Sequence, residues 1–396
     1  MPDARFFASS PESVGIDPEK LHAVFERAEQ EVRDGLLPSV QIAIARQGKI
    51  AGMRTFGRVS HEERAAAATN DTLYVVFSAT KALTSAAAWL LIEEGRLSIA
   101  ERVADIIPEF GSGGKDVVTV EQLFTHTAGF PYAPFNPLEW HDRAKRVERF
   151  GRWKLNWEPG TRFEYHPTST MWVVAELIER RSGMGFGEFV RSRIATPLGL
   201  SDLYVGLPPA LHGRVADIVH VGSKPAAEEL KAFGYPDMAD GTLIEDALLG
   251  FNQRAVREVG VPGGGGIMTA GDLALFYQAL LAEGRAPDGR QIWKPETIRM
   301  ARQIRSGELS DPVFHKRANR GLGIIVAGDE DKVYRGFGRS GSELMFGHNG
   351  AGGQIAWADP ETGISIGYCT NGLDRNPFRQ ARRTTAISSR AAVCAL

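Results

Sequence analysis

The chain has 396 residues, of which 43% are hydrophobic and 24% charged, the composition of an ordinary globular protein. Its formal net charge of −2 gives no electrostatic reason to expect binding to nucleic acid or to an anionic membrane. The two cysteines, Cys369 and Cys394, are too few for a disulfide framework, although one bridge stays open as an alternative.

Targeting and metal-binding patterns are absent from the sequence. The N-terminus lacks the basic start and apolar stretch of a secretory signal, and no apolar run approaches the roughly 18 residues of a membrane span. We therefore expect a cytoplasmic protein with no membrane partner. The nine histidines form no H-E-x-x-H motif and the cysteines no C-x-x-C pair, so we expect neither a metal nor another cofactor. The oligomeric state is open, with a homodimer as one option.

The N-terminal segment predicts a helix followed by a β-hairpin. Asp17 and Pro18 are typical of a helix start, and Gly35 ends the helix after about residue 34. Residues 39–57 then form two alternating stretches around Gln47-Gly48, a pair that favours a tight turn.

The stretch "VVFSATKALTSAAAWLLIEEG", residues 75–95, predicts one long buried helix with an S-x-x-K tetrad near its start. Residues three apart share a helix face, so the Ser78 hydroxyl and the Lys81 amine can meet. A buried ammonium is costly. Lys81 is therefore either an ammonium with a buried partner or with its head in solvent, or a neutral amine that accepts the proton of Ser78. The tetrad alone leaves both interpretations open.

Helices dominate the middle of the chain, and strands return near the C-terminus. Residues 168–183 and 269–284 have apolar residues at helical spacing, whereas residues 352–372 predict a second strand pair before a final helix near Pro377. This order predicts an α+β fold with an antiparallel sheet built from both termini and flanked by helices. We place the sheet domain at residues 1–70 plus 262–396, an inserted, mostly helical domain at residues 71–261, and the active site in the cleft between them.

Four motifs in chain order make the sequence recognisable: the S-x-x-K tetrad, "LFTHTAGF" (123–130), "FEYHPTS" (163–169) and "FGHNGAGG" (346–353). Over roughly residues 37–372 the chain resembles the serine hydrolases of the class C β-lactamase and penicillin-binding-protein-like superfamily, and among them most closely the family VIII carboxylesterases. The resemblance implies a β-lactamase/transpeptidase-like fold. It also implies that Ser78 is the nucleophile and that Lys81 and Tyr165 act together as the general base. The alternative for Tyr165 is a core tyrosine.

The last motif departs from the K-T-G triplet of β-lactamases because it reads His348-Asn349-Gly350. Histidine is mostly neutral at pH 7, so the fixed positive charge that would hold a carboxylate is missing, which suits uncharged substrates. The resemblance implies that this triplet contacts the substrate and that the amides of Ser78 and Ala351 form an oxyanion hole. The alternative is an ordinary turn between strands. A second departure is Pro167, which stands where β-lactamases usually have a substrate-binding asparagine.

The predicted function is a serine carboxylesterase that hydrolyses small neutral esters through an acyl-enzyme on Ser78. A proline-broken segment between residues 126 and 157 is predicted to cover the site and to contact an apolar acyl or alcohol group through its aromatic residues Phe130, Tyr132, Phe135 and Trp157. Alternatively, these rings pack the segment onto the helical lobe. The same machinery also allows a β-lactamase, a D-amino-acid peptidase or amidase, or an acyltransferase to an alcohol. A non-catalytic ligand-binding relative is the remaining alternative.

One further serine lies in a motif of a different hydrolase class. Residues 363–367 match G-x-S-x-G, the nucleophile elbow of α/β-hydrolases. In that fold the catalytic histidine follows the serine in the chain, but no histidine follows His348. We therefore predict that Ser365 is a strand residue without a catalytic role.

Overall fold

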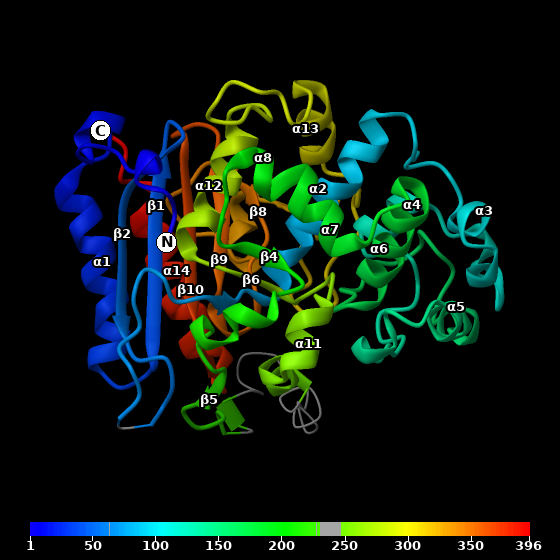
Figure 1. Cartoon of the computed structure of the whole chain (residues 1–396), viewed down its shortest axis with the longest axis horizontal. Coiled ribbons are helices and arrows are strands. Elements are labelled where there is room, and N and C mark those ends of the chain that lie inside the picture. The colour runs from blue at the N-terminus through cyan, green and yellow to red at the C-terminus, as the bar shows by residue number, and fades with distance from the viewer. Residues whose placement is uncertain (63, 227, 230–246) are drawn as a thin grey trace.

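The protein, for which a computed structural model describes residues 1–62, 64–226, 228–229 and 247–396, is built around a six-stranded antiparallel sheet (Figure 1). Its strand order is β2-β1-β10-β9-β8-β7. The pairing of β1 with β10 joins the two ends of the chain, which confirms the predicted sheet. The strands are β1 (Ser39–Arg46), β2 (Lys49–Gly57), β7 (Ile325–Val326), β8 (Phe346–Gly347), β9 (Ile355–Asp359) and β10 (Ile364–Thr370).

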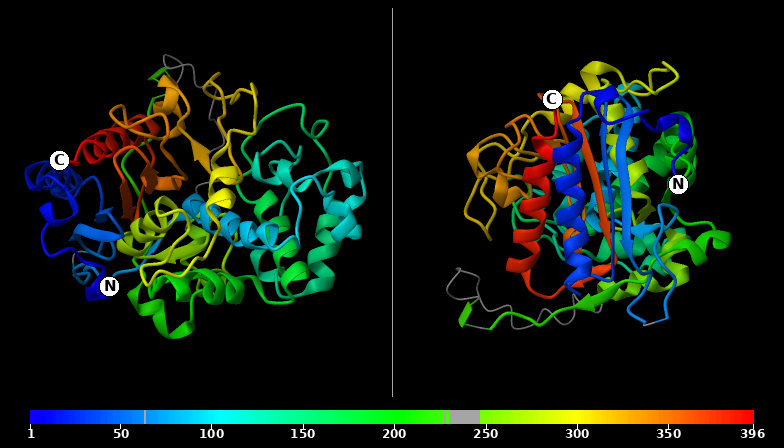
Figure 2. Two further views of the ribbon diagram at one scale, coloured as in Figure 1. Left: turned by 90° about the horizontal axis from the view of Figure 1, so that it is seen from above. Right: turned by 90° about the vertical axis from the view of Figure 1, so that its left-hand side faces the viewer.

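Helices cover both faces of this sheet. The helices α1 (Pro18–Arg33) and α14 (Pro377–Ala392) lie side by side on one face (Figure 2), and α12 (Ala270–Leu281) packs on the other. The carboxylate of Asp17 accepts hydrogen bonds from the first turn of α1, as expected of a helix cap. Gln47 and Gly48 have positive φ angles of 53° and 74°, which fits the predicted tight turn between β1 and β2.

The alternation of large and small side chains decides which helices fit each face. In β1, Val40, Ile42 and Ile44 point toward α1 and α14, whereas Ala43 and Ala45 point toward the core on the α12 side. These small residues allow the helix α12 to pack closely against this face of the sheet. In β10 a Cβ at Gly367 would lie only 2.1 Å from the carbonyl oxygen of Ala270, the first residue of α12.

The remaining elements form the mostly helical region and two small sheets. The three-stranded sheet has the order β3-β6-β4, and the two-stranded sheet pairs β11 with β5. Because β6, which follows the predicted boundary at residue 261, pairs with β3 and β4, which both precede it, this small sheet crosses the boundary, and the division into two domains stays a prediction. These strands are β3 (Tyr74–Val75), β4 (Leu203–Val205), β5 (Val219–Val221), β6 (Gly266–Met268) and β11 (Gly372–Asp374); the helices are α2 (Thr80–Glu93), α3 (Val103–Ile106), α4 (Val120–Phe124), α5 (Arg143–Arg152), α6 (Ser169–Ser182), α7 (Phe186–Val190), α8 (Thr196–Leu198), α11 (Arg254–Val259) and α13 (Pro295–Arg302).

The expected helix over residues 75–95 starts later than the sequence pattern indicates. Val75 belongs to β3, and the Val76 amide donates a hydrogen bond to the carbonyl of Gly266. A 3₁₀ turn (Phe77–Ala79) then precedes α2. Phe77 has a φ of +46°, which is rare for an aromatic residue, so the chain turns sharply just before Ser78. Pairing with β6 therefore overrides the helical pattern at this point.

Both cysteines are buried free thiols, so the single disulfide left open by the sequence does not form. Within the described ranges, no helix combines the length and apolar character required to cross a bilayer.

A buried carboxyl group at the start of α12 makes the stability of the fold depend on pH. Asp272 is fully buried, and its Oδ2 accepts a hydrogen bond from the Thr269 hydroxyl at 2.7 Å. Its Oδ1 has no partner among the described residues. Burial raises the pKa of Asp272 from 3.8 to about 7. The folded state therefore holds this proton at pH values where the unfolded chain has lost it, and stability falls as the pH rises from about 4 to about 7.

We predict that Asp272→Asn removes this dependence. Between pH 5 and pH 8 the free energy of unfolding of the variant should gain about 2 kcal/mol relative to wild type, measured by urea unfolding at each pH. Substituting the exposed Asp116 by Asn serves as the control and should leave the wild-type pH profile unchanged. Parallel profiles for wild type and Asp272→Asn would contradict the expectation.

Candidate active site

Ser78 and Lys81 lie together at the start of α2, as the S-x-x-K spacing predicts. The Lys81 Nζ lies 3.3 Å from the Ser78 Oγ. Lys81 is fully buried, whereas Ser78 is only partly buried. The hydroxyl thus contacts the amine while it keeps some solvent-accessible surface.

Two backbone carbonyls hold the Lys81 amine. Its Nζ donates to the carbonyl oxygen of Pro167 at 2.6 Å and to that of Gly263 at 2.7 Å. A neutral amine has two N–H groups and one lone pair, so the two carbonyls use both donors and leave the lone pair for the Ser78 hydroxyl. Burial lowers the pKa of Lys81, although its interaction with Tyr165 opposes this shift. The arrangement favours an amine that can accept a proton.

The Tyr165 ring lies beside this amine, at 5.0 Å from the Lys81 Nζ to the ring centroid. The ring is also next to two histidines, with centroid distances of 4.7 Å to His126 and 6.1 Å to His348. His126 is buried, and its Nδ1 accepts a hydrogen bond from the His166 amide at 3.1 Å, which fixes the segment that carries Tyr165. The structure therefore brings Ser78, Lys81 and Tyr165 into one site.

The last motif lies in the connection between β8 and β9. His348 is buried, and burial together with the positive charges of Lys81 and Arg320 lowers its pKa well below the usual range. Its Nδ1 lies 2.8 Å from the carbonyl oxygen of Asn349 and therefore carries the hydrogen, which leaves Nε2 as an unpaired acceptor among the described residues. The histidine is thus neutral. The Asn349 amide contacts the backbone of Gly336 and Ala356, so this side chain holds the motif in place.

Gly350 brings this connection against the start of α2. A Cβ at Gly350 would lie 2.2 Å from the carbonyl oxygen of Val76, so this close approach requires glycine. Ala351 opens a short 3₁₀ turn, and Ser78 lies in the 3₁₀ turn that precedes α2. Amides in the first turn of a helix have no partner within that helix. The two segments that carry these amides therefore lie against each other, and neither amide has a partner in its own turn; the oxyanion hole itself stays a prediction.

The four aromatic residues predicted to contact substrate separate into two groups. Phe130 is completely buried, with its ring centroid 5.6 Å from that of Trp153. The ring of Phe135 packs at a tilt against Trp172 of α6, with 4.5 Å between the centroids. These two rings pack the segment onto the helical region, the alternative that the sequence left open. Tyr132 is 67% exposed and Trp157 is partly exposed, so their contacts with substrate stay a prediction.

Sequence patterns gave no indication of two further contributors to the site. Gly263 belongs to the glycine-rich stretch 261–269, which forms a close-packed turn, and its carbonyl binds Lys81. Arg320 precedes β7, and its Cζ lies 5.5 Å from the ring centroid of Tyr165 and 5.4 Å from that of Phe163. Its charge, after burial, helps to lower the pKa of His126. A backbone carbonyl has no sequence signature, and Arg320 lies in none of the motifs.

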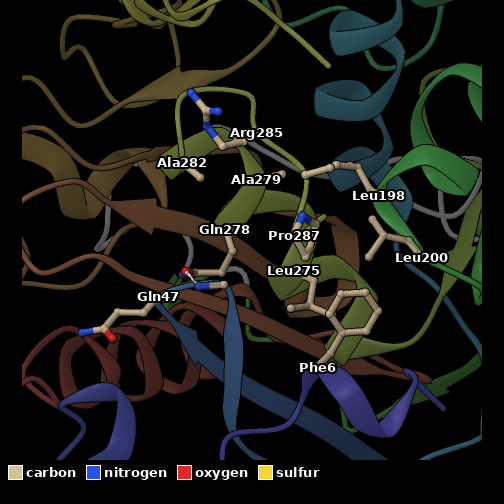
Figure 3. Close-up of a pocket in the computed structure, with 12 residues that line it drawn as sticks. Phe6, Gln47, Leu198, Leu200, Leu275, Gln278, Ala279, Ala282, Arg285 and Pro287 are labelled. Carbon is tan, nitrogen blue, oxygen red and sulfur yellow. Dashed lines mark hydrogen bonds between the residues drawn. The ribbon is translucent and has the colours of Figure 1, made fainter. Parts of the chain in front are cut away.

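Ser365 has a structural role in β10. It is completely buried, donates to the carbonyl of Ala274 at 2.8 Å and accepts from the Gln278 amide at 2.9 Å. Gln278 also lines a pocket on the α12 side of the sheet (Figure 3), together with Phe6 and Leu275. None of the residues of the four motifs lines this pocket, so it is separate from the site at Ser78.

Known proteins resemble this chain in sequence and in fold. The family model described as Beta-lactamase matches residues 25–390. A protein of Escherichia coli strain K12 with the provisional name D-alanyl-D-alanine carboxypeptidase is 26% identical over 385 residues, covering 92% of this chain and 85% of that protein.

Two solved structures match nearly the whole chain. A penicillin-binding protein homologue from Caulobacter crescentus has 29% sequence identity and a TM-score of 0.77, covering 95% of this chain and 99% of the homologue. A family VIII carboxylesterase has 26% identity and a TM-score of 0.76, with the same coverage. The protein belongs to the beta-lactamase family and is a serine hydrolase with the β-lactamase-like α+β fold.

Proposed function

We propose that the protein is a carboxylesterase that forms an acyl-enzyme on Ser78, with Lys81 and Tyr165 as the general base. The observation that carries this proposal is the environment of the Lys81 amine. Its Nζ lies 3.3 Å from the Ser78 Oγ and donates hydrogen bonds to two backbone carbonyls, and burial lowers its pKa. The nearby phenol of Tyr165 gives a path for the proton toward the leaving group.

The reaction proceeds in two steps. The Lys81 lone pair accepts the Ser78 proton while the oxygen attacks the ester carbonyl, and the amides of Ser78 and Ala351 stabilise the oxyanion. Tyr165 passes the proton to the leaving alcohol. Water, deprotonated by the same pair, then attacks the acyl-enzyme. The bond between the acyl carbon and the Ser78 Oγ breaks, the pair returns the proton to this oxygen, and the acid leaves. Tyr132 and Trp157 are proposed to contact the acyl or alcohol group.

The neutral His348 supports an ester as the scissile group. A β-lactam or a peptide C-terminus has a carboxylate, which the lysine of a K-T-G triplet could hold; at this position the present chain has an uncharged imidazole. The match to a family VIII carboxylesterase supports the same choice. The peptidase alternative is favoured by the name of the Escherichia coli relative, and acyl transfer to an alcohol remains a second alternative.

Removing the nucleophile should abolish turnover. We expect Ser78→Ala to lower kcat for 4-nitrophenyl butyrate by about 10⁴-fold or more, because no other group can form the acyl-enzyme. A fluorophosphonate probe followed by mass spectrometry should modify Ser78 in the wild type. The matched control is Ser365→Ala, which should keep the adduct on Ser78. Labelling or turnover that survives in Ser78→Ala would refute the scheme.

Displacing the Ala351 amide should slow the chemical step. A Cβ in Gly350→Ala would clash with the Val76 carbonyl, so the connection must move away from Ser78. We expect kcat to fall by about 10²-fold, the usual cost of losing one oxyanion donor. Gly213→Ala is the control, because a Cβ at Gly213 has no atom within 4 Å. Wild-type kcat in a folded Gly350→Ala variant would exclude Ala351 from the oxyanion hole.

Ester and lactam hydrolysis can be compared directly. Because position 348 has no charge to hold the lactam carboxylate, kcat/KM for 4-nitrophenyl butyrate should exceed that for nitrocefin by about 10²-fold, roughly the contribution of one charge-assisted hydrogen-bonded pair. Initial rates with both substrates, followed spectrophotometrically on the same enzyme preparation, provide the measurement. A preference for nitrocefin would instead favour the β-lactamase alternative.

A further inference from the structure

The guanidinium of Arg320 is buried next to the catalytic residues, where it contacts the rings of Phe163 and Tyr165 while two of its N–H groups lack a hydrogen-bond partner in the described part of the chain. Only 8% of the residue is exposed, and its Nε and Nη1 have no hydrogen-bond partner among the described residues. The carboxylate with the largest electrostatic effect on it is that of Asp311, whose Oδ1 accepts from the amides of Val313 and Phe314. Arginine stays charged in proteins, so a cation is buried with unused donors, which is costly.

The position of Arg320 is fixed against the helix that also carries the nucleophile. The carbonyl of Leu322 accepts a hydrogen bond from the Trp89 indole of α2 at 3.1 Å. A Cβ at Gly323 would lie 1.8 Å from the Ser85 Oγ, so the following turn packs directly on α2. The Arg320 amide donates to the Ser306 hydroxyl at 3.0 Å. The backbone of Arg320 is therefore held rigidly relative to Ser78.

Arg320 also lies within reach of a small molecule bound at Ser78. The Ser78 Oγ is 3.3 Å from the Lys81 Nζ, which is 5.0 Å from the Tyr165 centroid, and that centroid is 5.5 Å from the Arg320 Cζ. The sum of these distances limits the separation of nucleophile and guanidinium to 13.8 Å at most. The binding mode proposed below requires a separation shorter than this limit, because an extended five-carbon diacyl chain does not span 13.8 Å.

We propose that Arg320 is an anion-binding residue of this site and that the ester substrate has a carboxylate, as in a monoester of a short dicarboxylic acid. The proposal rests on the esterase function proposed above and specifies its substrate class. A carboxylate accepts two parallel hydrogen bonds from a guanidinium and compensates its charge. Stacking of Arg320 on Tyr165 alone would leave its buried donors unsatisfied. Where β-lactamases have the anion-binding lysine of their K-T-G triplet, this chain has the neutral His348. Arg320 binds the carboxylate at a different position of the same site.

Calorimetric titration of two matched ligands tests this proposal. Monomethyl glutarate has a free carboxylate, and methyl valerate is an uncharged ester with the same acyl chain length. Titrated into Ser78→Ala protein, which cannot turn them over, monomethyl glutarate should bind about 10- to 100-fold more tightly. Arg320→Met in the same background should abolish the difference. Arg317→Met, at an exposed arginine of the same segment, is the control and should preserve it.

Equal affinity of the two ligands for Ser78→Ala protein would overturn the proposal without any substitution at Arg320. Failure of the esterase function is detected separately, as absent hydrolysis of 4-nitrophenyl butyrate by wild type. In turnover assays the ratio of kcat/KM for monomethyl glutarate to that for methyl valerate should fall about 10- to 100-fold in Arg320→Met and less in Arg320→Lys. An equal loss for both esters would assign Arg320 to the positioning of Tyr165 instead.

Discussion

The hydrogen bonds from the Lys81 amine to the carbonyls of Pro167 and Gly263 are the contacts on which the site depends. They join α2, the segment that carries Tyr165 and the glycine-rich turn before β6. A Cβ at Gly263 would lie 3.0 Å from the Thr168 Cα and 3.1 Å from the Pro167 carbonyl oxygen, so a larger residue would push the turn away from this segment. The same contacts that fix the amine therefore also fix its distance from the phenol. Ser78, Lys81 and Tyr165 are thus positioned by one packing arrangement.

The sheet and the motif residues could be predicted because their signals are local. Alternation in residues 39–57, the Asp17 cap and the S-x-x-K spacing each depend on neighbours a few residues apart. The late start of α2 could not be predicted from local pattern, since the pairing of β3 with β6 involves residues about 190 positions away and outweighs helical preference. The two backbone carbonyls that bind Lys81 could not be predicted from the sequence either, because every residue type has the same carbonyl group.

The aromatic segment shows why composition alone does not identify a binding surface. Phe130 and Phe135 have the same chemistry and the same proline-broken context as Tyr132. The first two nevertheless lie in or against the core of the helical region, and Tyr132 is exposed. Periodicity is absent in this stretch, so no pattern tells which side chains face inward. Burial there is decided by contacts with α6, which are known only once the fold is known.

The electrostatics of the site are determined by two buried basic residues. Lys81 and Arg320 are both fully or nearly buried, and burial opposes the charge of each. The lysine can respond by losing its proton, which makes it a base, whereas the arginine cannot. A lysine at position 348 would add a second buried cation beside Arg320, with Coulomb repulsion that low-dielectric surroundings do not screen. The neutral histidine avoids this repulsion. Arg320 and His348 are therefore electrostatically linked: with a permanent cation at one position, an uncharged residue at the other is the arrangement that the buried site can accommodate.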